Sequence, residues 1–585
     1  MKNLATLLLF LAAVLFGGCN TDNVIYDGRG PLPVIVLDSA DGRYTVKTGC
    51  ELTLAPSVEN AAGAAYEWIL GSESVGSEAS HTFVFAEAGI YYATFRVTTS
   101  AGAAEEDLSI EAVEPSRPVI SLAVPAGGLT VAVGTDCTLQ PVIRNSDVAG
   151  FRCEWLLDGV KVSEERSYTF RSDETGRFTL TIRAANEDGE DSRDVEIEVV
   201  AELPQSVRFA PQSYLQRSTE RSVEVGRPIY LKPAVENFTA PRFVWTVDGV
   251  QAEANGGLFI FTPEREGLFR VAVTVSDAVR GSSVRAEVDV RCGRAVLRGR
   301  SGASRRTQDC VYEYIPAPGQ FINETLTGGF TDGITTHEAA AAYAAERMAG
   351  DKFVSLGGFG GYMVVGFDHS VVNRGGGSYD FAIQGNAFLS GAGGSNEPGI
   401  VWVMQDTNGN GLPDDEWYEL RGSASDAEDT LRDYSVTYYR PEGPRMAVQW
   451  TDSEGASGTI DYIKAFHRQD FYYPLWIAES SYTLTGTRLS PRNSEDSAGN
   501  WHNNAFEWGY ADNYGDDNLS GEVGAGGEGQ RTGFRISNAM HPDGTPVGLA
   551  FIDFVKVQTA LNTKSGALGE NSTEVYSFTD LSMEE

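Results

Sequence analysis

The sequence is poor in the residues that carry most metal and nucleophile chemistry. Its 585 residues include only six histidines and six cysteines. None of them has a spacing typical of a zinc site, such as Cys-x-x-Cys or His-Glu-x-x-His. A Gly-x-Ser-x-Gly turn and a phosphate-binding loop are also missing. The sequence therefore predicts a protein that is not an enzyme.

Positive charge and long hydrophobic runs are also scarce. Forty-five Lys and Arg face 81 Asp and Glu, which gives a net charge of -36. A chain this acidic repels nucleic acid and anionic lipid, so neither is an expected partner. Beyond residue 18 no apolar run is long enough for a membrane-spanning helix. The composition suits a soluble, exposed protein.

The N-terminus carries a short apolar run, residues 4–16, that follows Lys2 and ends just before Gly17-Gly18-Cys19. A run this short predicts a signal peptide over residues 1–18. Small residues before a cysteine resemble the bacterial lipobox. That resemblance implies cleavage before Cys19, lipidation of Cys19 and anchoring of the linker 19–32 in the outer membrane. Residues 20–23 resemble an acidic surface-export tag, and an ordinary signal peptide with a chance cysteine is the alternative.

The first half of the chain repeats itself. Trp68, Trp155 and Trp245 recur at about 90-residue intervals, each within a Glu-Trp or Val-Trp strand pattern followed by a turn. An aromatic triplet and a Gly-x-aromatic pattern follow each Trp and open alternating apolar positions. Period-two alternation with regular turns is typical of immunoglobulin-type β-sandwiches. A buried Trp is expected to pin each core.

These patterns resemble the polycystic-kidney-disease (PKD) family of domains. The resemblance gives repeats at residues 33–114, 115–201 and 202–291. A tandem array is expected to act as a stiff spacer, with glycan binding on a sheet face as the alternative. Among the cysteines, Cys137 could pair with Cys153, and Cys292 with Cys310, which leaves one of the five unlipidated cysteines over.

The character of the chain changes in residues 292–585. Thr335 and Glu338 fit a capping box that predicts a helix over residues 339–348, ended by Gly350. Apolar strand patterns follow at residues 363–368, 380–383, 400–403, 435–439 and 551–557, separated by Gly-rich turns. The predicted fold class is therefore all-β and multidomain. Three sandwiches precede a larger β-sandwich, jelly-roll-like, with one short helix and long functional loops.

The end domain also carries a longer signature. It includes residues 366–368, 373, 379–381, 385–388, 397–403, 406–415, 417–420 and 552–558. This signature resembles a family of bacterial cell surface proteins with PKD-like modules and a jelly-roll or galactose-binding-like end domain. Some relatives resemble surface lipoproteins that capture cobalamin and other corrinoids beside an outer-membrane transporter. The resemblance implies a corrinoid ligand and a TonB-dependent transporter as partner.

One loop has the pattern of a calcium site. Oxygen-bearing side chains stand at positions 1, 3, 5 and 9 of a loop with Gly at position 6, and position 7 would offer a carbonyl. Trp417 replaces the bidentate Glu expected at position 12, so an EF-hand is excluded. Structural calcium is the expected cofactor, and a metal-free turn is the alternative. The predicted ligands are Asp406, Asn408, Asn410, Leu412, Asp414 and Asp415.

Aromatic side chains interleaved with amides gather late in the chain. Aromatic rings can stack on the face of a flat, amphipathic ligand, and amides can form hydrogen bonds with its polar edge. A small second core beneath a long loop is the alternative. The predicted ligand-binding residues are Tyr472, Tyr473, Trp476, Trp501, His502, Asn503, Asn504, Phe506, Trp508 and Tyr510.

Together these features predict a non-enzymatic surface lipoprotein. Its C-terminal domain is expected to capture a small extracellular nutrient, a corrinoid by the resemblance, with a glycan as the alternative. A glycan-active enzyme would need two converging carboxylates in a cleft. A structural adhesin would show no pocket on the end domain.

Overall fold

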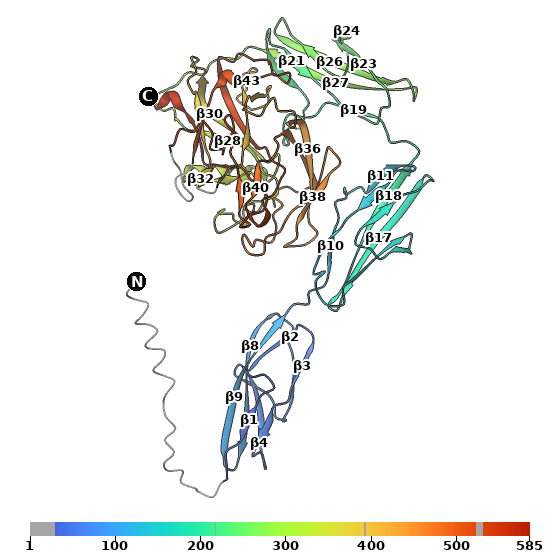
Figure 1. Cartoon of the computed structure of the whole chain (residues 1–585), viewed down its shortest axis with the longest axis vertical. Coiled ribbons are helices and arrows are strands. Elements are labelled where there is room, and N and C mark those ends of the chain that lie inside the picture. The colour runs from blue at the N-terminus through green and yellow to red at the C-terminus, as the bar shows by residue number, and fades with distance from the viewer. Residues whose placement is uncertain (1–29, 217, 255, 391–392, 522–529, 585) are drawn as a thin grey trace. The chain divides into compact units, whose positions relative to one another are not determined.

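The computed structural model describes residues 30–216, 218–254, 256–390, 393–521 and 530–584. Cys19 and the signal segment lie outside these residues, as does most of the linker. The described chain is nearly all β-structure, which confirms the predicted fold class (Figure 1). It divides into two compact units, Met1–Arg117 and Pro118–Glu585. Within the described ranges, no helix combines the length and the apolar character that a membrane crossing needs.

The first repeat forms one five-stranded sheet, in the order β2-β9-β8-β5-β6, and two short strand pairs, β1-β4 and β3-β7. Strand β2 runs parallel to β9, and the other pairs are antiparallel. Its strands are β1 (Val34–Val36), β2 (Arg43–Lys47), β3 (Glu51–Leu54), β4 (Ser57–Glu59), β5 (Ala65–Leu70), β6 (Glu73–Gly76), β7 (His81–Val84), β8 (Gly89–Thr99) and β9 (Gly102–Val113).

The second and third repeats have the same strand order, β11-β18-β17-β14-β15 and β20-β27-β26-β23-β24. The second contains β10 (Val119–Ser121), β11 (Leu129–Ala132), β12 (Cys137–Leu139), β13 (Val142–Arg144), β14 (Arg152–Leu157), β15 (Val160–Ser163), β16 (Tyr168–Phe170), β17 (Gly176–Asn186) and β18 (Gly189–Val200). The third contains β19 (Ser206–Arg208), β20 (Arg221–Glu224), β21 (Ile229–Leu231), β22 (Ala234–Glu236), β23 (Pro241–Val247), β24 (Val250–Gln251), β25 (Phe259–Phe261), β26 (Gly267–Asp277) and β27 (Ser282–Gly293).

Each repeat is pinned by its predicted tryptophan. Trp68, Trp155 and Trp245 lie on β5, β14 and β23 and are at most 1% exposed. Each indole N–H donates to a backbone carbonyl 10 or 11 residues further along, at 3.1 Å. A buried indole is stable when its one polar group is bonded, so the sequence pattern and the core coincide.

The larger domain contains sheets of six, four and three strands, in the orders β28-β30-β44-β34-β35-β43, β38-β37-β36-β39 and β42-β31-β46. Short pairs β29-β45, β32-β33 and β40-β41 complete it. Every strand predicted from its sequence is present. The strands are β28 (Cys310–Ile315), β29 (Val354–Ser355), β30 (Tyr362–Val372), β31 (Phe381–Gln384), β32 (Phe388–Ser390), β33 (Gly393–Ser395), β34 (Gly399–Met404), β35 (Tyr418–Leu420), β36 (Leu431–Tyr439), β37 (Val448–Asp452), β38 (Ser457–Ile460), β39 (Ser481–Arg488), β40 (Asn493–Glu495), β41 (Trp501–Asn503), β42 (Arg531–Phe534), β43 (Ala539–Met540), β44 (Phe551–Thr559), β45 (Glu574–Val575) and β46 (Ser577–Asp580).

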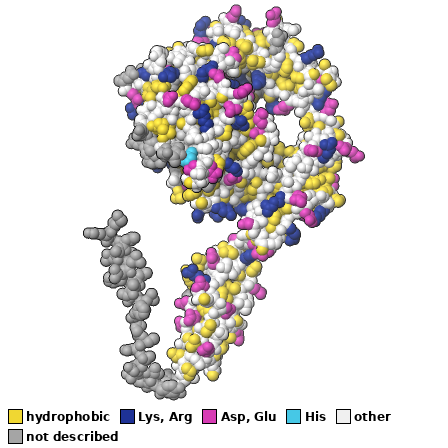
Figure 2. All heavy atoms as spheres, in the orientation of Figure 1, with side chains coloured by type: hydrophobic (Ala, Val, Ile, Leu, Met, Phe, Trp, Pro, Cys, Tyr) yellow, Lys and Arg dark blue, Asp and Glu magenta, His cyan; other side chains and the backbone are white. Residues whose placement is uncertain are grey.

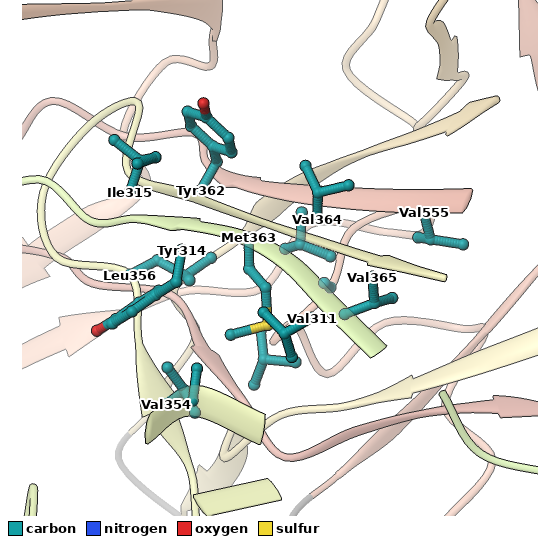
Figure 3. Packing of buried hydrophobic residues seen from close by; sticks show 14 of the residues in the cluster. Val311, Tyr314, Ile315, Val354, Leu356, Tyr362, Met363, Val364, Val365 and Val555 are labelled. Atoms are coloured by element: carbon teal, nitrogen blue, oxygen red, sulfur yellow. The ribbon is translucent and has the colours of Figure 1, made fainter. Parts of the chain in front are cut away.

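One hydrophobic core joins these sheets. Residues of β28 and β30 pack with Leu356 and with Val555 of β44, as Figure 3 shows at close range. Strand β30 is buried along most of its length, because neighbouring strands cover its edges and packed side chains cover its faces. A separate small cluster contains Phe506 and Tyr510.

The predicted helix is α2 (His337–Ala349), and it packs against β28. Its N-cap is Thr336 and not Thr335, since the Thr336 side chain accepts from the N–H of Ala339 at 3.2 Å. Glu338 is therefore at the second helical position, and the predicted capping box does not form. Gly350 ends the helix as expected. Among the described residues, three segments form one-turn 3-10 helices, Ile536–Asn538, Gly566–Leu568 and Leu581–Met583.

The second and third repeats contact the larger domain, which corrects the expectation of a simple three-module spacer. The N–H of Tyr214 donates to the hydroxyl of Tyr362 at 3.0 Å. Arg227 donates to Gln405 at 2.8 Å. In the second repeat, the carbonyl of Gln140 accepts from Gln449 at 2.8 Å. These two repeats therefore belong to the same compact unit as the larger domain.

Neither proposed disulfide is present. All five described cysteines are free, and they are Cys50, Cys137, Cys153, Cys292 and Cys310. Cys137 lies on β12 and Cys153 on β14, strands that belong to different sheets of the second repeat. Hydrophobic cores and strand pairing hold the repeats together in place of cross-links.

The surface is mixed in charge. On the face shown in Figure 2, acidic, basic and apolar side chains are interspersed, and no broad apolar patch is visible there.

Candidate functional site

A pocket of about 250 Å³ lies in the larger domain, and we refer to it as the Trp508 pocket. It combines three aromatic side chains, two arginines and two aspartates on segments far apart in the sequence. Its lining residues are Tyr379, Leu420, Arg421, Trp508, Gly509, Asp516, Asp517, Gly533, Phe534, Arg535 and Asn538.

Glycines set the shape of the pocket wall. Gly509 has φ +94°, and a Cβ there would lie 2.4 Å from the Cα of Gly422. Any side chain at position 509 would clash with the backbone of Gly422, just after β35, and would displace the Trp508 segment. At Gly533 a Cβ would lie 2.6 Å from the Tyr379 ring. The two glycines therefore allow Trp508 and Tyr379 to occupy their places in the wall.

Both arginines of the pocket are held in position. The Arg535 guanidinium lies over the Tyr379 ring, 4.1 Å from its centroid, and its Nε donates to the carbonyl of Gly377 at 2.8 Å. Arg421 pairs with Asp426 and donates to the carbonyl of Gly544 at 2.6 Å. Anchored guanidiniums lose little freedom when a ligand binds, so they suit recognition of a polar ligand.

Asp517 is the most distinctive group in the pocket. It is 4% exposed, and one of its oxygens accepts from the N–H of Gly509 at 2.6 Å. Its other oxygen, Oδ1, is buried and has no hydrogen-bond partner within the part of the chain that the structure describes. Burial raises the pKa of Asp517 to about 6. A buried acceptor without a partner costs free energy that a ligand donor would recover.

The chemistry of the pocket suits a small polar ring. An aromatic face can stack on a ring, Asp517 Oδ1 can accept from a hydroxyl or amide, and the arginines can donate to ligand oxygens. The volume lies slightly below the range of about 300–1,000 Å³ usual for drug-sized ligands. The pocket therefore admits one ring or one arm of a larger ligand rather than a whole polycyclic molecule.

A larger groove of about 570 Å³ lies beside the C-terminal end of α2. Its arginines are already paired, Arg531 with Glu584 at 2.8 Å and Arg305 with Asp309 at 3.6 Å. It has no aromatic side chain in its lining. Paired charges and the lack of a stacking surface make this groove a weaker candidate than the Trp508 pocket.

Of the ten aromatic and polar residues predicted to bind ligand, the structure brings only Trp508 into this pocket. Tyr472, Tyr473 and Trp476 are at most 4% exposed and belong to the main core. Tyr473 packs edge-on against Tyr482 and bonds the carbonyl of Glu479. Phe506 and Tyr510 form part of the small second cluster. For these five residues the alternative interpretation, a core beneath a long loop, fits the structure.

The remaining predicted residues are occupied elsewhere. Trp501 is half-buried and its ring lies against Gly566. His502 contacts Asp496 at 3.3 Å, and Asn503 accepts from Ser565 at 2.7 Å. Asn504 donates to the carbonyl of Arg492 at 2.7 Å. These contacts hold the β40-β41 hairpin and its surroundings, away from the Trp508 pocket.

Sequence reasoning missed Tyr379, Arg421, Asp517 and Arg535. Tyr379 lies within the surface-protein signature, but that signature implies no ligand-binding role for it. The two arginines and Asp517 have no local pattern that marks them. Only the pairing of β31 with β42 and the close approach at Gly422 bring these residues together.

The predicted calcium loop is closed by its own hydrogen bonds. Asp406 Oδ1 accepts from the N–H groups of Gly409 and Asn410, and Oδ2 accepts from that of Gly411, at 2.7–3.1 Å. The side-chain amides of Asn408 and Asn410 both donate to Asp414 at 2.9 Å. Calcium would require these two amides to turn their oxygens inward.

Two other predicted ligands point to different roles. Asp415 accepts from the N–H and hydroxyl of Thr407 at 2.9 and 2.6 Å, and burial raises its pKa to about 7. Leu412 is half exposed, and its N–H donates to Asn410 at 2.8 Å. The Asn408 amide also reaches Ser222 of the third repeat at 3.4 Å. The loop therefore lies at the contact between that repeat and the larger domain.

We expect Asp406→Ala to lower stability whether or not calcium is present. Three backbone N–H groups lose their acceptor, which costs about 2–3 kcal/mol if water only partly replaces it. Thermal melting in calcium and in chelator measures the stability that the variant loses with and without the ion. Asp426→Ala, on the exposed surface, is the control. Equal melting of Asp406→Ala and the unaltered protein in chelator would contradict this account.

Comparison with known proteins supports the repeats. A PKD-like domain model matches residues 32–99 and 117–186, which lie in the first two repeats. The third repeat has the same strand order and buried tryptophan. Domains of this type are characteristic of surface and adhesion-type extracellular proteins. No curated protein matches the chain.

Similar solved structures are tandem β-sandwich modules. The fibronectin(III)-like modules of Clostridium thermocellum CbhA are 16% identical and cover 28% of this chain and 94% of their own, with a TM-score of 0.18. Titin domains I67–I69 are 13% identical and cover 44% and 98%, with a TM-score of 0.21. Three N-terminal domains of the bacteriophage RB49 outer capsid protein Hoc are 14% identical, cover 44% and 98%, and have a TM-score of 0.21. Scores this low carry no argument about function.

Proposed function

We propose that this chain is a lipid-anchored surface protein that captures a small extracellular nutrient in the Trp508 pocket. The observation that carries this proposal is the buried, unpartnered oxygen of Asp517 beside an aromatic wall and two anchored arginines. No group in the described part of the chain donates to that acceptor, whereas a bound hydroxyl or amide would.

The anchor and its setting come from the sequence. Lipidation at Cys19 would place the protein on the outer membrane, with the repeats and end domain exposed. The captured nutrient would then pass to an outer-membrane transporter of the TonB-dependent type. Binding without turnover is the proposed activity.

Two ligand classes fit the pocket chemistry. A sugar ring of a glycan would stack on Trp508 or Tyr379 and donate a hydroxyl to Asp517. A corrinoid, which the surface-protein resemblance suggests, would insert one amide arm and lie mostly outside, because about 250 Å³ is too small for its ring system. The volume of the pocket by itself favours a sugar ring over a corrinoid.

A glycan-active enzyme is the second candidate function, because two aspartates, Asp516 and Asp517, line the pocket. That chemistry needs two carboxyl groups on opposite sides of a glycosidic bond. Release of reducing sugar from a bound glycan would favour the enzyme, and intact recovery of the glycan would favour capture.

Trp508→Ala and Asp517→Asn should each weaken ligand binding by about 1–3 kcal/mol, the range for a truncated stacking ring or a lost charge-assisted hydrogen bond. Isothermal titration calorimetry with cyanocobalamin and a glycan panel measures this on the full chain. Trp501→Ala is the matched control, because that ring is half-buried outside the pocket. Unchanged affinity in both pocket variants, or an equal loss in the control, would contradict the assignment.

A further inference from the structure

Three carboxylates that belong to neither the Trp508 pocket nor the Asp406 loop meet at one point of the larger domain. Glu397 precedes β34, Asp512 follows the Trp508 segment, and Glu574 opens β45. Carboxylate oxygens from all three lie within 4.8 Å of one another. Asp512 and Glu574 are at most 1% exposed, and Glu397 is partly exposed.

The surrounding backbone holds these groups in place. Asp512 Oδ1 accepts from the N–H groups of Asn386 and Ala387 at 2.7 and 2.8 Å, and Oδ2 accepts from that of Glu574 at 2.9 Å. Ser572 donates its N–H to Glu397 at 3.1 Å and its hydroxyl to Glu574 at 2.9 Å. The arrangement is therefore built by tertiary contacts rather than gathered on one exposed loop.

A buried amide supplies a second, independent observation. Asn571 is 1% exposed, and its Nδ2 faces Glu397 at 3.4 Å, a long contact for a hydrogen bond. Its oxygen, Oδ1, is buried and has no partner among the described residues. The two ends of an amide have nearly the same shape, so a half-turn brings this oxygen to the carboxylates. After that half-turn the amide would add a neutral oxygen to the three carboxylates, and such a donor set suits a hard cation.

The charges need neutralisation. Within the described residues, none of the three carboxylates forms an ion pair with Lys, Arg or His. Either shared protons or a bound cation can relieve such a cluster. Asp512 accepts from three backbone N–H groups, which matches a carboxylate that carries no proton, and a bound cation would balance its charge.

We propose that Glu397, Asp512, Glu574 and Asn571 form a binding site for a hard divalent cation, with Ca²⁺ as the preferred ion. All the donors are oxygens, which suits Ca²⁺ and not the transition metals that need imidazole or thiolate. Three carboxylates plus an amide exceed the one or two carboxylates that Mg²⁺ usually takes.

A cation here would fasten the loop that forms the pocket wall. Asp512 stands between Trp508 and Asp517 in the sequence, and the Asp512 segment also pairs with Gly399 and Glu397 through backbone hydrogen bonds at 2.9–3.0 Å. Cation binding would therefore order the pocket wall before a ligand arrives. This consequence rests on the proposed ligand pocket, but the cation site itself does not.

The test is a titration of the full chain with CaCl₂ after removal of metals, with no ligand present. Calorimetry should report one Ca²⁺ that the unaltered protein binds and that Glu574→Gln does not. The melting temperature of the unaltered protein should rise by about 5 °C at saturating Ca²⁺, since only the native state binds the ion. MgCl₂ should bind at least about tenfold more weakly, because Mg²⁺ gives up its waters reluctantly.

Two variants separate this site from the alternatives. Asp406→Asn, in the loop predicted from sequence, should keep both the bound ion and the melting shift. Asn571→Asp adds a fourth carboxylate and should raise Ca²⁺ affinity while lowering the melting temperature in chelator, a gain that an unfolded variant could not produce. Absence of binding, retention of binding in Glu574→Gln with loss in Asp406→Asn, or unchanged affinity in Asn571→Asp would each overturn the proposal. Because no ligand is added, these outcomes leave the Trp508 pocket to its own test.

Discussion

Cys19→Ala should move nearly all of the protein from the membrane fraction to the soluble fraction. A single acyl chain binds membranes only marginally, with a partition constant of about 10⁴ M⁻¹, whereas two or more hold stably. Lipidated Cys19 would carry more than one chain. Fractionation of cells expressing the full chain measures the change.

Cys50→Ala is the matched control for this variant. Cys50 is a free, exposed thiol in the first repeat, so its loss should leave the protein on the membrane. A Cys19→Ala protein that stays in the membrane fraction after a high-salt wash would contradict the lipoprotein assignment. It would favour an ordinary signal peptide that ends near a chance cysteine.

The repeats were predictable because their signals are local. In each repeat a tryptophan, a turn and an alternating strand follow one another within about 30 residues, and period-two alternation defines the buried face. The helix was predictable for the same reason. Its cap was off by one residue. Thr335 and Thr336 can both cap a helix, and the capping-box spacing to Glu338 favours Thr335, whereas the backbone conformation selects Thr336.

The functional residues were less predictable, because distant contacts decide their exposure. Tyr472 and Tyr473 lie in a polar, aromatic segment that suits a binding loop, yet packing against other tyrosines buries both. Composition cannot tell a buried ring from a stacking ring. The Glu397, Asp512 and Glu574 cluster has no sequence spacing at all, since three separate segments supply it.

The contact between the third repeat and the larger domain could not be anticipated either. Strand β21 presents Ile229 and Leu231 to the core of its own repeat, while Tyr230 between them faces outward. Tyr230 bonds Asp543 at 2.8 Å and stacks on His541 at 5.1 Å. Period-two alternation predicts the inner face of this strand, but it does not tell whether water or another domain covers the outer face.

This contact makes two equivalent substitutions behave differently. Trp68→Ala and Trp245→Ala each remove a buried indole from a repeat core, which should cost about 3–5 kcal/mol. Trp68 lies in the compact unit Met1–Arg117, so its loss should increase hydrogen exchange within residues 33–114 only. Trp245 packs in the same core as Ile229 and Leu231, and its loss should loosen β21 together with Tyr230. Exchange should therefore increase in residues 202–291 and also near Gln405 and Asp543 of the larger domain.

Hydrogen exchange measured by mass spectrometry distinguishes the two patterns at peptide resolution. If Trp245→Ala left exchange at those two places unchanged, the third repeat would be energetically independent, and its contacts with the larger domain would contribute little to stability.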